Sequence, residues 1–300
     1  MTTKKEGKEF QEYRKQWELA TKMEILTEVP LHIDIELTNK CNLDCKMCWQ
    51  NEEMTYSKGN MDFTLFKKII DESVISGVKA IKLQSRGEST IYPKLFDAIK
   101  YAKKKGIMDI QITTNATMFK SSNNNDFLTS GLDLLIISID NDHIESYNRL
   151  NKDKNYEEVV QNILNLLIER DNRKLKSPQI RLQITSATTD INPLVAKYKE
   201  SFEKYVDYFT IDPYFLLSDN DGIVTNPRTT PCPYPWQRLV INYDGKVTVC
   251  CRDFNCSMIM GDIKNETLSQ IWNSDKFNNF RELHSLGRRA EIDFCRICNS

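Results

Sequence analysis

Three cysteines at short, fixed intervals constrain this chain more than any other feature of its sequence. Cys41, Cys45 and Cys48 directly follow LHIDIEL (31–37), whose alternation of apolar and polar residues predicts a strand. Three thiolates on one loop can bind three irons of a cubane cluster and leave the fourth iron open to a non-protein ligand. A zinc site is the alternative, but it needs a fourth ligand nearby, and His32 lies at the far end of the strand.

Charge and hydropathy exclude several classes of partner. The 41 basic and 42 acidic residues leave a net charge of −1 without a long basic run, so nucleic acid is not expected as a partner. The N-terminus lacks the apolar core of a signal peptide, and no stretch of 18 apolar residues occurs, which predicts a cytoplasmic protein that binds no membrane. In a reducing cytosol, nine cysteines grouped at 41–48 and 232–298 indicate metal rather than disulfides.

Strand and helix patterns alternate along most of the chain. The expected strands are 31–37, 79–84, 107–115, 132–140, 179–185 and 206–212. The expected helices are 8–26, 62–77 with Asp62 as its cap, 92–106, a short one after 121–125, 155–170 and 193–205. About six β/α units predict an α/β fold, a partial (β/α)6 TIM-like barrel with its chemistry at the carboxyl ends of the strands.

The pattern changes in the proline-containing segment 214–235, and a boundary is expected near residue 225. Beyond it, 236–251 reads as a hairpin that turns at Asp244 and Gly245, followed by helices at about 265–274 and 275–286. The predicted domains are a helical extension (1–30), the barrel (31–225) and a small C-terminal domain of a hairpin plus helices (226–300).

The segment TNKCNLDCKMCWQ (38–50) resembles the signature of the radical S-adenosylmethionine family, C-x3-C-x2-C after the first strand of a partial barrel. The resemblance extends over most of residues 31–300. It implies that Cys41, Cys45 and Cys48 hold a [4Fe–4S] cluster whose open iron binds S-adenosylmethionine. A low-potential electron then cleaves the sulfonium to give a 5′-deoxyadenosyl radical.

Weaker motifs extend this resemblance to the cofactor-binding residues. QSRGES (84–89) resembles the family's G-G-E-P, which implies that Gly87 and Glu88 bind the amino group of the cofactor's methionine; it departs from the pattern at Arg86 and Ser89. Arg86 is expected to contact an anion or to pair with Glu88 on the surface.

Further expected cofactor contacts lie at strand ends. Ser138 and Asp140 resemble the ribose-contacting segment, Asn115 faces the same cavity, and Met47 stands where many members have an aromatic residue beside the adenine. Ordinary strand-end capping is the alternative role for Asn115, Ser138 and Asp140.

Six further cysteines lie near the C-terminus, and their segment resembles the auxiliary-cluster domain called SPASM in its shortened twitch form. The resemblance implies a second [4Fe–4S] cluster on Cys232, Cys250, Cys295 and Cys298. Adjacent strand residues point to opposite faces, so Cys250 and Cys251 do not easily serve one cluster, and the family match selects Cys250. A zinc ribbon on the same four thiolates remains the alternative.

A four-cysteine cluster has no open iron, so its expected role is electron transfer. The leading hypothesis is a two-electron dehydrogenation of an alcohol carbon on a sugar or aminocyclitol, as in twitch-type aminoglycoside-pathway dehydrogenases. An epimerase with Cys256 or Cys251 as hydrogen donor, a peptide-modifying enzyme, and a zinc-binding scaffold are the alternatives. A flavodoxin- or ferredoxin-type protein is the expected electron donor.

Other residues carry less information. Trp236, Arg238 and Asp212 lie near the expected junction of the two domains, where a substrate pocket would open. The three histidines, His32, His143 and His284, show no ligand spacing and are expected to be structural, and no catalytic base is identified.

Overall fold

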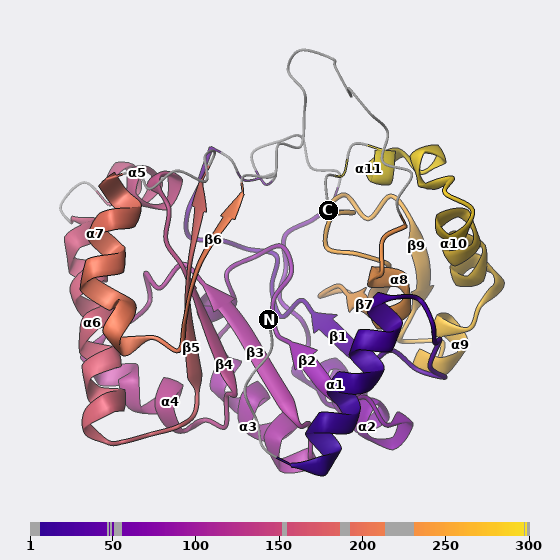
Figure 1. The fold of residues 1–300 in the computed structure, drawn as a ribbon, viewed down its shortest axis with the longest axis horizontal. Coiled ribbons are helices and arrows are strands. Elements are labelled where there is room, and N and C mark those ends of the chain that lie inside the picture. Colours follow the sequence, from indigo (N-terminus) through magenta and orange to yellow (C-terminus); the bar gives the residue numbers. More distant parts are fainter. Residues whose placement is uncertain are drawn as a thin grey trace.

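One open, largely parallel sheet forms the centre of the computed structural model. The structure describes residues 7–46, 48, 50, 56–151, 155–186, 193–213, 231–296 and 298. Within these ranges nine strands run in the order β6-β5-β4-β3-β2-β1-β7-β8-β9 (Figure 1). The strands are β1 (His32–Ile35), β2 (Ala80–Lys82), β3 (Asp109–Thr114), β4 (Leu134–Ser138), β5 (Gln179–Ser186), β6 (Tyr208–Pro213), β7 (Arg238–Ile241), β8 (Lys246–Thr248) and β9 (Ile259–Asp262).

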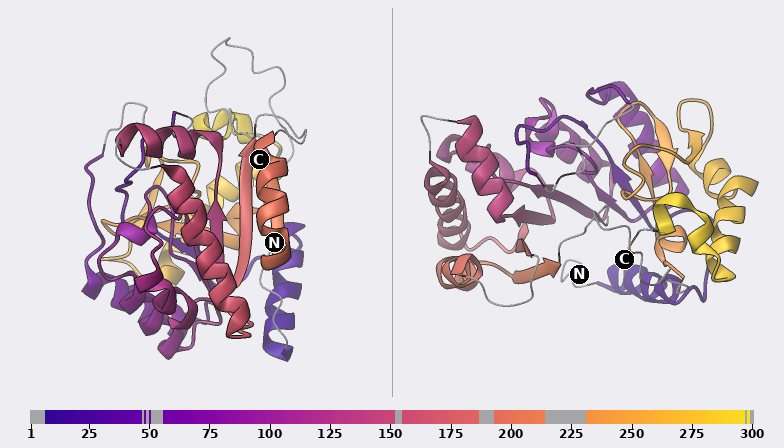
Figure 2. Two further views of the ribbon diagram at one scale, coloured as in Figure 1. Left: turned by 90° about the vertical axis from the view of Figure 1, so that its left-hand side faces the viewer. Right: turned by 90° about the horizontal axis from the view of Figure 1, so that it is seen from above.

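Strands β1 to β6 pair in parallel, each with the next, and helices connect them. The helices are α1 (Lys8–Thr21), α2 (Phe63–Ser76), α3 (Leu95–Lys105), α4 (Asn124–Thr129), α5 (Asn141–Leu150), α6 (Tyr156–Asn172), α7 (Pro193–Phe202), α8 (Tyr234–Gln237), α9 (Leu268–Trp272), α10 (Asp275–Ser285) and α11 (Asp293–Arg296). Figure 2 shows the strands as a curved wall with helices outside it. The described sheet ends at β6 and β9, so the partial barrel is confirmed.

Local sequence explains how the elements begin and end. The Asp62 side chain accepts hydrogen bonds from the backbone of Thr64 and Leu65 at 2.8 and 3.1 Å, which caps α2 as expected. Helix α3 ends at Gly106, whose φ of +101° suits a residue without a Cβ. The side chains of Ile33 and Ile35 are fully buried in the main core between sheet and helices.

The C-terminal hairpin extends the barrel sheet rather than forming a sheet of its own. Strand β7 pairs in parallel with β1, with Ile33 opposite Leu239, and β8 returns antiparallel after the turn at Gly245. The hairpin and the two helices that follow it are therefore confirmed. The predicted boundary near 225 lies outside the described residues.

The N-terminal helix is shorter than expected, because it ends at Thr21. Phe10 and Tyr13 of this helix pack with Leu31, Ala80 and Trp236 in a small cluster separate from the main core. Helix α5 and strand β9 were not predicted. No helix in the described ranges is long and apolar enough to cross a bilayer.

Candidate active site and second cysteine pocket

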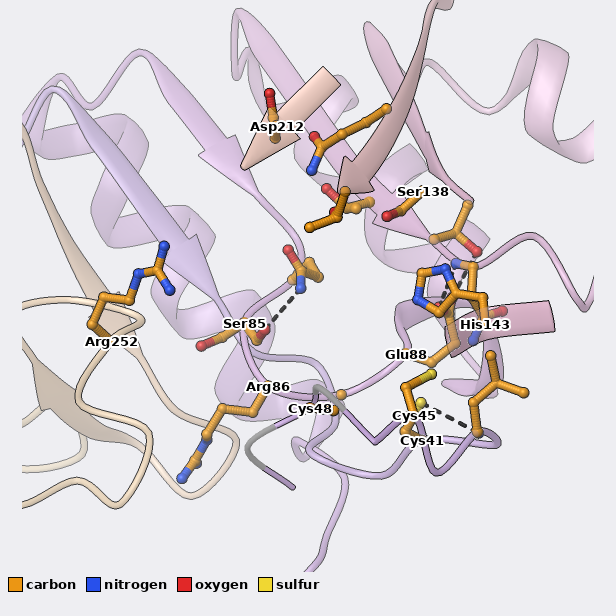
Figure 3. Close-up of a pocket in the computed structure, with 18 residues that line it drawn as sticks. Cys41, Cys45, Cys48, Ser85, Arg86, Glu88, Ser138, His143, Asp212 and Arg252 are labelled. Atoms are coloured by element: carbon orange, nitrogen blue, oxygen red, sulfur yellow. Dashed lines mark hydrogen bonds between the residues drawn. The ribbon is translucent and has the colours of Figure 1, made fainter. Parts of the chain in front are cut away.

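A cavity of about 280 Å³ lies at the carboxyl ends of the parallel strands, where the fold places chemistry. Figure 3 shows the first three cysteines at one side of it, Ser138 and His143 from β4 and α5 nearby, and Arg252 reaching in from the other side. Its lining residues are Cys41, Leu43, Cys45, Cys48, Gln84, Ser85, Arg86, Gly87, Glu88, Thr113, Thr114, Asn115, Ser138, His143, Gln183, Thr185, Asp212 and Arg252.

The cysteine loop is fastened to helix α5. The Asp44 backbone N–H donates to Ser146 Oγ at 2.8 Å, Ser146 Oγ donates back to Asp44 Oδ1 at 2.6 Å, and Arg149 donates to the same Oδ1 at 2.5 Å. A second tie runs to the end of β3, where Asn42 Nδ2 donates to Thr117 Oγ1 at 2.7 Å. These contacts fix the backbone on which the thiols sit.

Of the three cysteines of this loop, Cys45 is buried and Cys41 and Cys48 are half-buried. Burial raises the pKa of Cys41 to about 12, and it also raises the pKa values of Cys45 and Cys48. Iron binds thiolates, so loading a cluster here releases protons and supplies the positive charge that the thiolates need. Among the described residues, no three Cys, His, Asp or Glu side chains are arranged to hold a single metal ion. The open space beside the three thiols fits a cluster, larger than a single metal ion, that keeps one iron free for another ligand.

Gly87 is required by the protein's own backbone. A Cβ at this position would lie 2.3 Å from the Thr38 carbonyl oxygen and 2.5 Å from that of Lys40, just before the cysteine loop. The next residue continues the contact, because the Glu88 N–H donates to the Lys40 carbonyl at 2.8 Å. Glycine therefore allows close approach to residues 38–40. Gly87 also lines the cavity, and its expected contact with the cofactor's amino group stays a prediction.

The carboxylate of Glu88 lines the cavity and organises the end of β3. Its Oε1 accepts from Thr114 Oγ1 at 2.8 Å and from Thr90 Oγ1 at 2.6 Å, while its Oε2 accepts from the Asn115 N–H at 2.8 Å. Its expected contact with a cofactor amino group stays a prediction.

The other expected cofactor residues differ in their placement. Asn115 and Ser138 line the cavity, and Met47 lies outside the described residues. Asp140 is fully buried and caps α5, where its Oδ1 accepts from the His143 N–H at 2.8 Å. Asp140 does not line the cavity as described, so its ribose contact stays a prediction. His143, expected to be structural, does line it.

The four C-terminal cysteines selected by the family resemblance meet in a second, much smaller pocket of about 20 Å³. Cys232, Cys250, Cys295 and Cys298 all line it, together with apolar residues such as Phe280 and Phe294. Three separate segments supply these thiols: Cys232 lies two residues before α8, Cys250 lies in the loop after β8, and Cys295 and Cys298 lie in and just after α11. None of the nine cysteines, all within the described ranges, forms a disulfide.

His284 lies in this second pocket, against the expectation of a purely structural role. Its Nδ1 accepts from the Cys232 N–H at 3.2 Å, so Nε2 carries the ring proton and faces Cys295 Sγ at 3.6 Å. Burial, with a smaller contribution from Arg289, lowers the pKa of His284 to about 4 and keeps the ring neutral.

Two family models match this chain, one over each cysteine set. The radical SAM superfamily model matches residues 35–173, and the model of SPASM, an iron–sulfur cluster-binding domain, matches residues 232–299. This chain carries a radical SAM domain and a SPASM domain. The predicted cofactors, S-adenosylmethionine and two [4Fe–4S] clusters, are thereby confirmed, while their individual ligands remain predictions.

Curated proteins and solved structures are also similar to this chain. The tungsten-containing aldehyde ferredoxin oxidoreductase cofactor-modifying protein of Pyrococcus furiosus is 24% identical over 301 residues, 83% of each chain. The S-adenosyl-L-methionine-dependent 2-deoxy-scyllo-inosamine dehydrogenase of Niallia circulans is 37% identical over 90 residues, 28% of this chain and 36% of that one. The crystal structure of BtrN in complex with AdoMet and 2-DOIA shares the fold, with a TM-score of 0.60 and 19% identity over 91% of this chain and 94% of that chain.

The departure of this radical SAM enzyme from G-G-E-P at Arg86 has a structural reason. Arg86 forms a two-pronged ion pair with Glu36 at the end of β1, with Nε to Oε2 at 2.6 Å and Nη2 to Oε1 at 2.7 Å. Its Nη1 donates to the Phe254 carbonyl at 3.0 Å and to Cys256 Sγ at 3.1 Å. The expected surface pairing with Glu88 is therefore wrong: the Arg86 side chain is 3% exposed and joins the barrel to the C-terminal segment.

Two polar side chains of β5, Gln183 and Thr185, and Arg252 line the radical SAM cavity but were not singled out from the sequence. The signal for the first two was present, because Arg181, Gln183 and Thr185 alternate with buried apolar residues along the strand. No local pattern marks Arg252, which arrives from the C-terminal segment.

The two spare thiols have different surroundings. Cys256 accepts a hydrogen bond from Arg86, as described above. Cys251 lines a third cavity of about 230 Å³, which shares Gln84, Ser85 and Arg252 with the first.

Proposed function

We propose that this radical SAM enzyme dehydrogenates an alcohol carbon of a small polyhydroxylated molecule, of the sugar or aminocyclitol class. One observation carries the proposal: Arg252 lines both the first cysteine cavity and the second cysteine pocket. The two cysteine sets therefore share a wall. An electron left on a substrate in the first cavity would have a short path to an acceptor in the second.

The chain's own residues would bind and orient the reacting groups. The thiols that would hold the clusters are Cys41, Cys45 and Cys48 for the first and Cys232, Cys250, Cys295 and Cys298 for the second. When bound, S-adenosylmethionine and the first cluster would supply a 5′-deoxyadenosyl radical, which would remove the carbon-bound hydrogen atom. The second cluster would supply an acceptor for the electron that remains once the hydroxyl proton has left. Glu88, Asn115 and Ser138 would position the cofactor at the strand ends.

Similar proteins support the reaction type. The Niallia circulans relative is a dehydrogenase of 2-deoxy-scyllo-inosamine, and BtrN shares the fold over most of both chains. The expected reductant of the first cluster is a flavodoxin- or ferredoxin-type protein.

Epimerisation is the second candidate, because the Cys251 thiol faces the third cavity, which borders the first. A thiol there could return a hydrogen atom to the opposite face of the substrate carbon. Cys256 suits this role less well, because its sulfur is engaged by Arg86.

The test is product analysis in deuterated water. The anaerobically reconstituted enzyme is incubated with S-adenosylmethionine, a reductant and a panel of sugars and aminocyclitols that includes 2-deoxy-scyllo-inosamine. Dehydrogenation gives a ketone in amounts equal to 5′-deoxyadenosine. A product of unchanged oxidation state with deuterium on carbon, abolished by Cys251→Ala, would replace dehydrogenation by epimerisation.

A further inference from the structure

The third cavity lies between the two cysteine sites and carries an excess of positive charge. It shares Gln84 and Ser85 with the first cavity, Tyr234 with the second pocket, and Arg252 with both. We propose that this third cavity binds an acidic group of the substrate, a phosphate or a carboxylate, and that Lys82 selects for it. This inference rests on the proposed function, since it assigns the substrate class of the same site.

Strand register sets these charges side by side. Asp34 of β1 lies opposite Lys82 of β2, and His32 of β1 lies opposite Arg238 of β7. Alternation places Ile33 and Ile35 in the core under the helices and turns His32 and Asp34 to the inner face of the partial barrel. Closed barrels of this kind pack that inner face mainly with branched apolar side chains. Here the inner face is charged and lines a cavity.

Asp34, the one carboxylate among the described residues that line this cavity, already has its partners. Asp34 Oδ1 lies 3.1 Å from His32 Nε2, and Asp34 Oδ2 lies 3.6 Å from Arg238 Nη1. Although burial by itself raises the pKa of Asp34, Arg238 and the hydrogen bond from His32 lower it to about 2, so the group is ionised. Arg238 is thus balanced by Asp34.

Lys82 has no such balance. Its Nζ makes no hydrogen bond and no ion pair in the described part of the chain, although the side chain lines the cavity. Burial lowers the pKa of Lys82 even though the nearby Asp34 and Cys251 favour its charged form, so removing this ammonium from water has a cost that they do not offset. Among the described residues that line the cavity, Lys82, Arg238 and Arg252 are cationic and Asp34 alone is a carboxylate.

An acidic substrate group would remove that cost. An ammonium acts as a compact point charge suited to phosphate or carboxylate, and the pair gains strength in a cavity with restricted water. The substrate named for the Niallia circulans relative is an inosamine, which bears an amine rather than an acid. The substrate of this chain is therefore expected to differ from it in charge.

The experiment is isothermal titration of the cluster-loaded enzyme, with S-adenosylmethionine present, using three probes: myo-inositol, myo-inositol 1-phosphate and glucuronate. The phosphate probe is expected to bind at least about tenfold more tightly than myo-inositol, the size of one charge-assisted hydrogen bond. Lys82→Met is expected to abolish this preference and Lys82→Arg to retain it. Lys79→Met, on the exposed residue just before β2, is the matched control and should leave it intact.

Glucuronate distinguishes the two acidic groups that the substrate could carry. If glucuronate binds tightly, the cavity accepts a carboxylate; if its affinity equals that of myo-inositol, the cavity is specific for a phosphate. Equal affinity for all three probes, or an unchanged preference in Lys82→Met with normal iron content, would overturn the proposal. Binding is measured without turnover. A failed dehydrogenation assay and a failed charge preference are therefore separate results.

Discussion

The two cysteine sites of this chain are built in opposite ways. The first takes its thiols from one short loop and opens into a cavity of about 280 Å³ that many polar residues line. The second takes four thiols from distant segments and closes them into an apolar pocket of about 20 Å³. Three thiols beside open space suit a cluster that must accept a ligand, whereas four enclosed thiols suit a cluster that only exchanges electrons. The proposed dehydrogenation assigns radical formation to the first site and electron removal to the second.

Removing the first set should have the largest effect. The Cys41→Ala/Cys45→Ala/Cys48→Ala variant is expected to lose all formation of 5′-deoxyadenosine, because the second cluster, which remains, has no open iron to bind S-adenosylmethionine. The measurement is chromatography of the anaerobic reaction. Cleavage of S-adenosylmethionine by the variant at the wild-type rate would show that the first cavity is not where the radical forms.

Removing one thiol of the second set should separate the two steps. Cys295→Ala is expected to keep S-adenosylmethionine cleavage and to lose the ketone by a factor of ten or more, since the electron then has no acceptor. The ratio of ketone to 5′-deoxyadenosine measures this. Cys256→Ala serves as the matched control because this thiol is outside both ligand sets. A ratio unchanged in Cys295→Ala would contradict the division between the sites.

The same contrast explains what the sequence could reveal. The first site is local: C-x3-C-x2-C, the strand before it and the capped helix after it are readable from spacing and periodicity. The second site depends on thiols that are far apart in the chain, and only the family resemblance predicted that they form one site. The roles of Arg86 and Arg252 could not be predicted, because they depend on the approach of the C-terminal segment to the barrel, which has no local signal. The role of His284 depends on contacts with Cys232 and Cys295, which are distant from it in the sequence.

Arg86 joins the barrel to the C-terminal segment. Its substitution should therefore lower the free energy of unfolding without removing a thiol from either cysteine set. Arg86→Met leaves Glu36 charged and buried, and the expected loss of unfolding free energy is about 3–5 kcal/mol. Denaturant titration followed by circular dichroism measures it. The double variant Arg86→Met/Glu36→Gln removes the stranded charge and should recover part of the loss. Equal stability of Arg86→Met and wild type would show that the ion pair is not a structural link.

The smallest effect is expected at His284, which faces the second site alone. His284→Leu removes the Nε2–H that faces Cys295 Sγ at 3.6 Å. Hydrogen bonds to cluster sulfurs raise the reduction potential, so the second cluster should become harder to reduce while the first is unchanged. Redox titration followed by electron paramagnetic resonance resolves the two. A shift in the first cluster only would contradict the placement of His284.

The account rests on two separate clusters, one in each cysteine site. Iron and acid-labile sulfide per chain, measured on anaerobically reconstituted wild type and on the variant that lacks Cys41, Cys45 and Cys48, test this most directly. About eight irons falling to about four in the variant is the predicted result. About four irons falling to none would contradict it, because the second pocket would then hold no cluster and no electron acceptor.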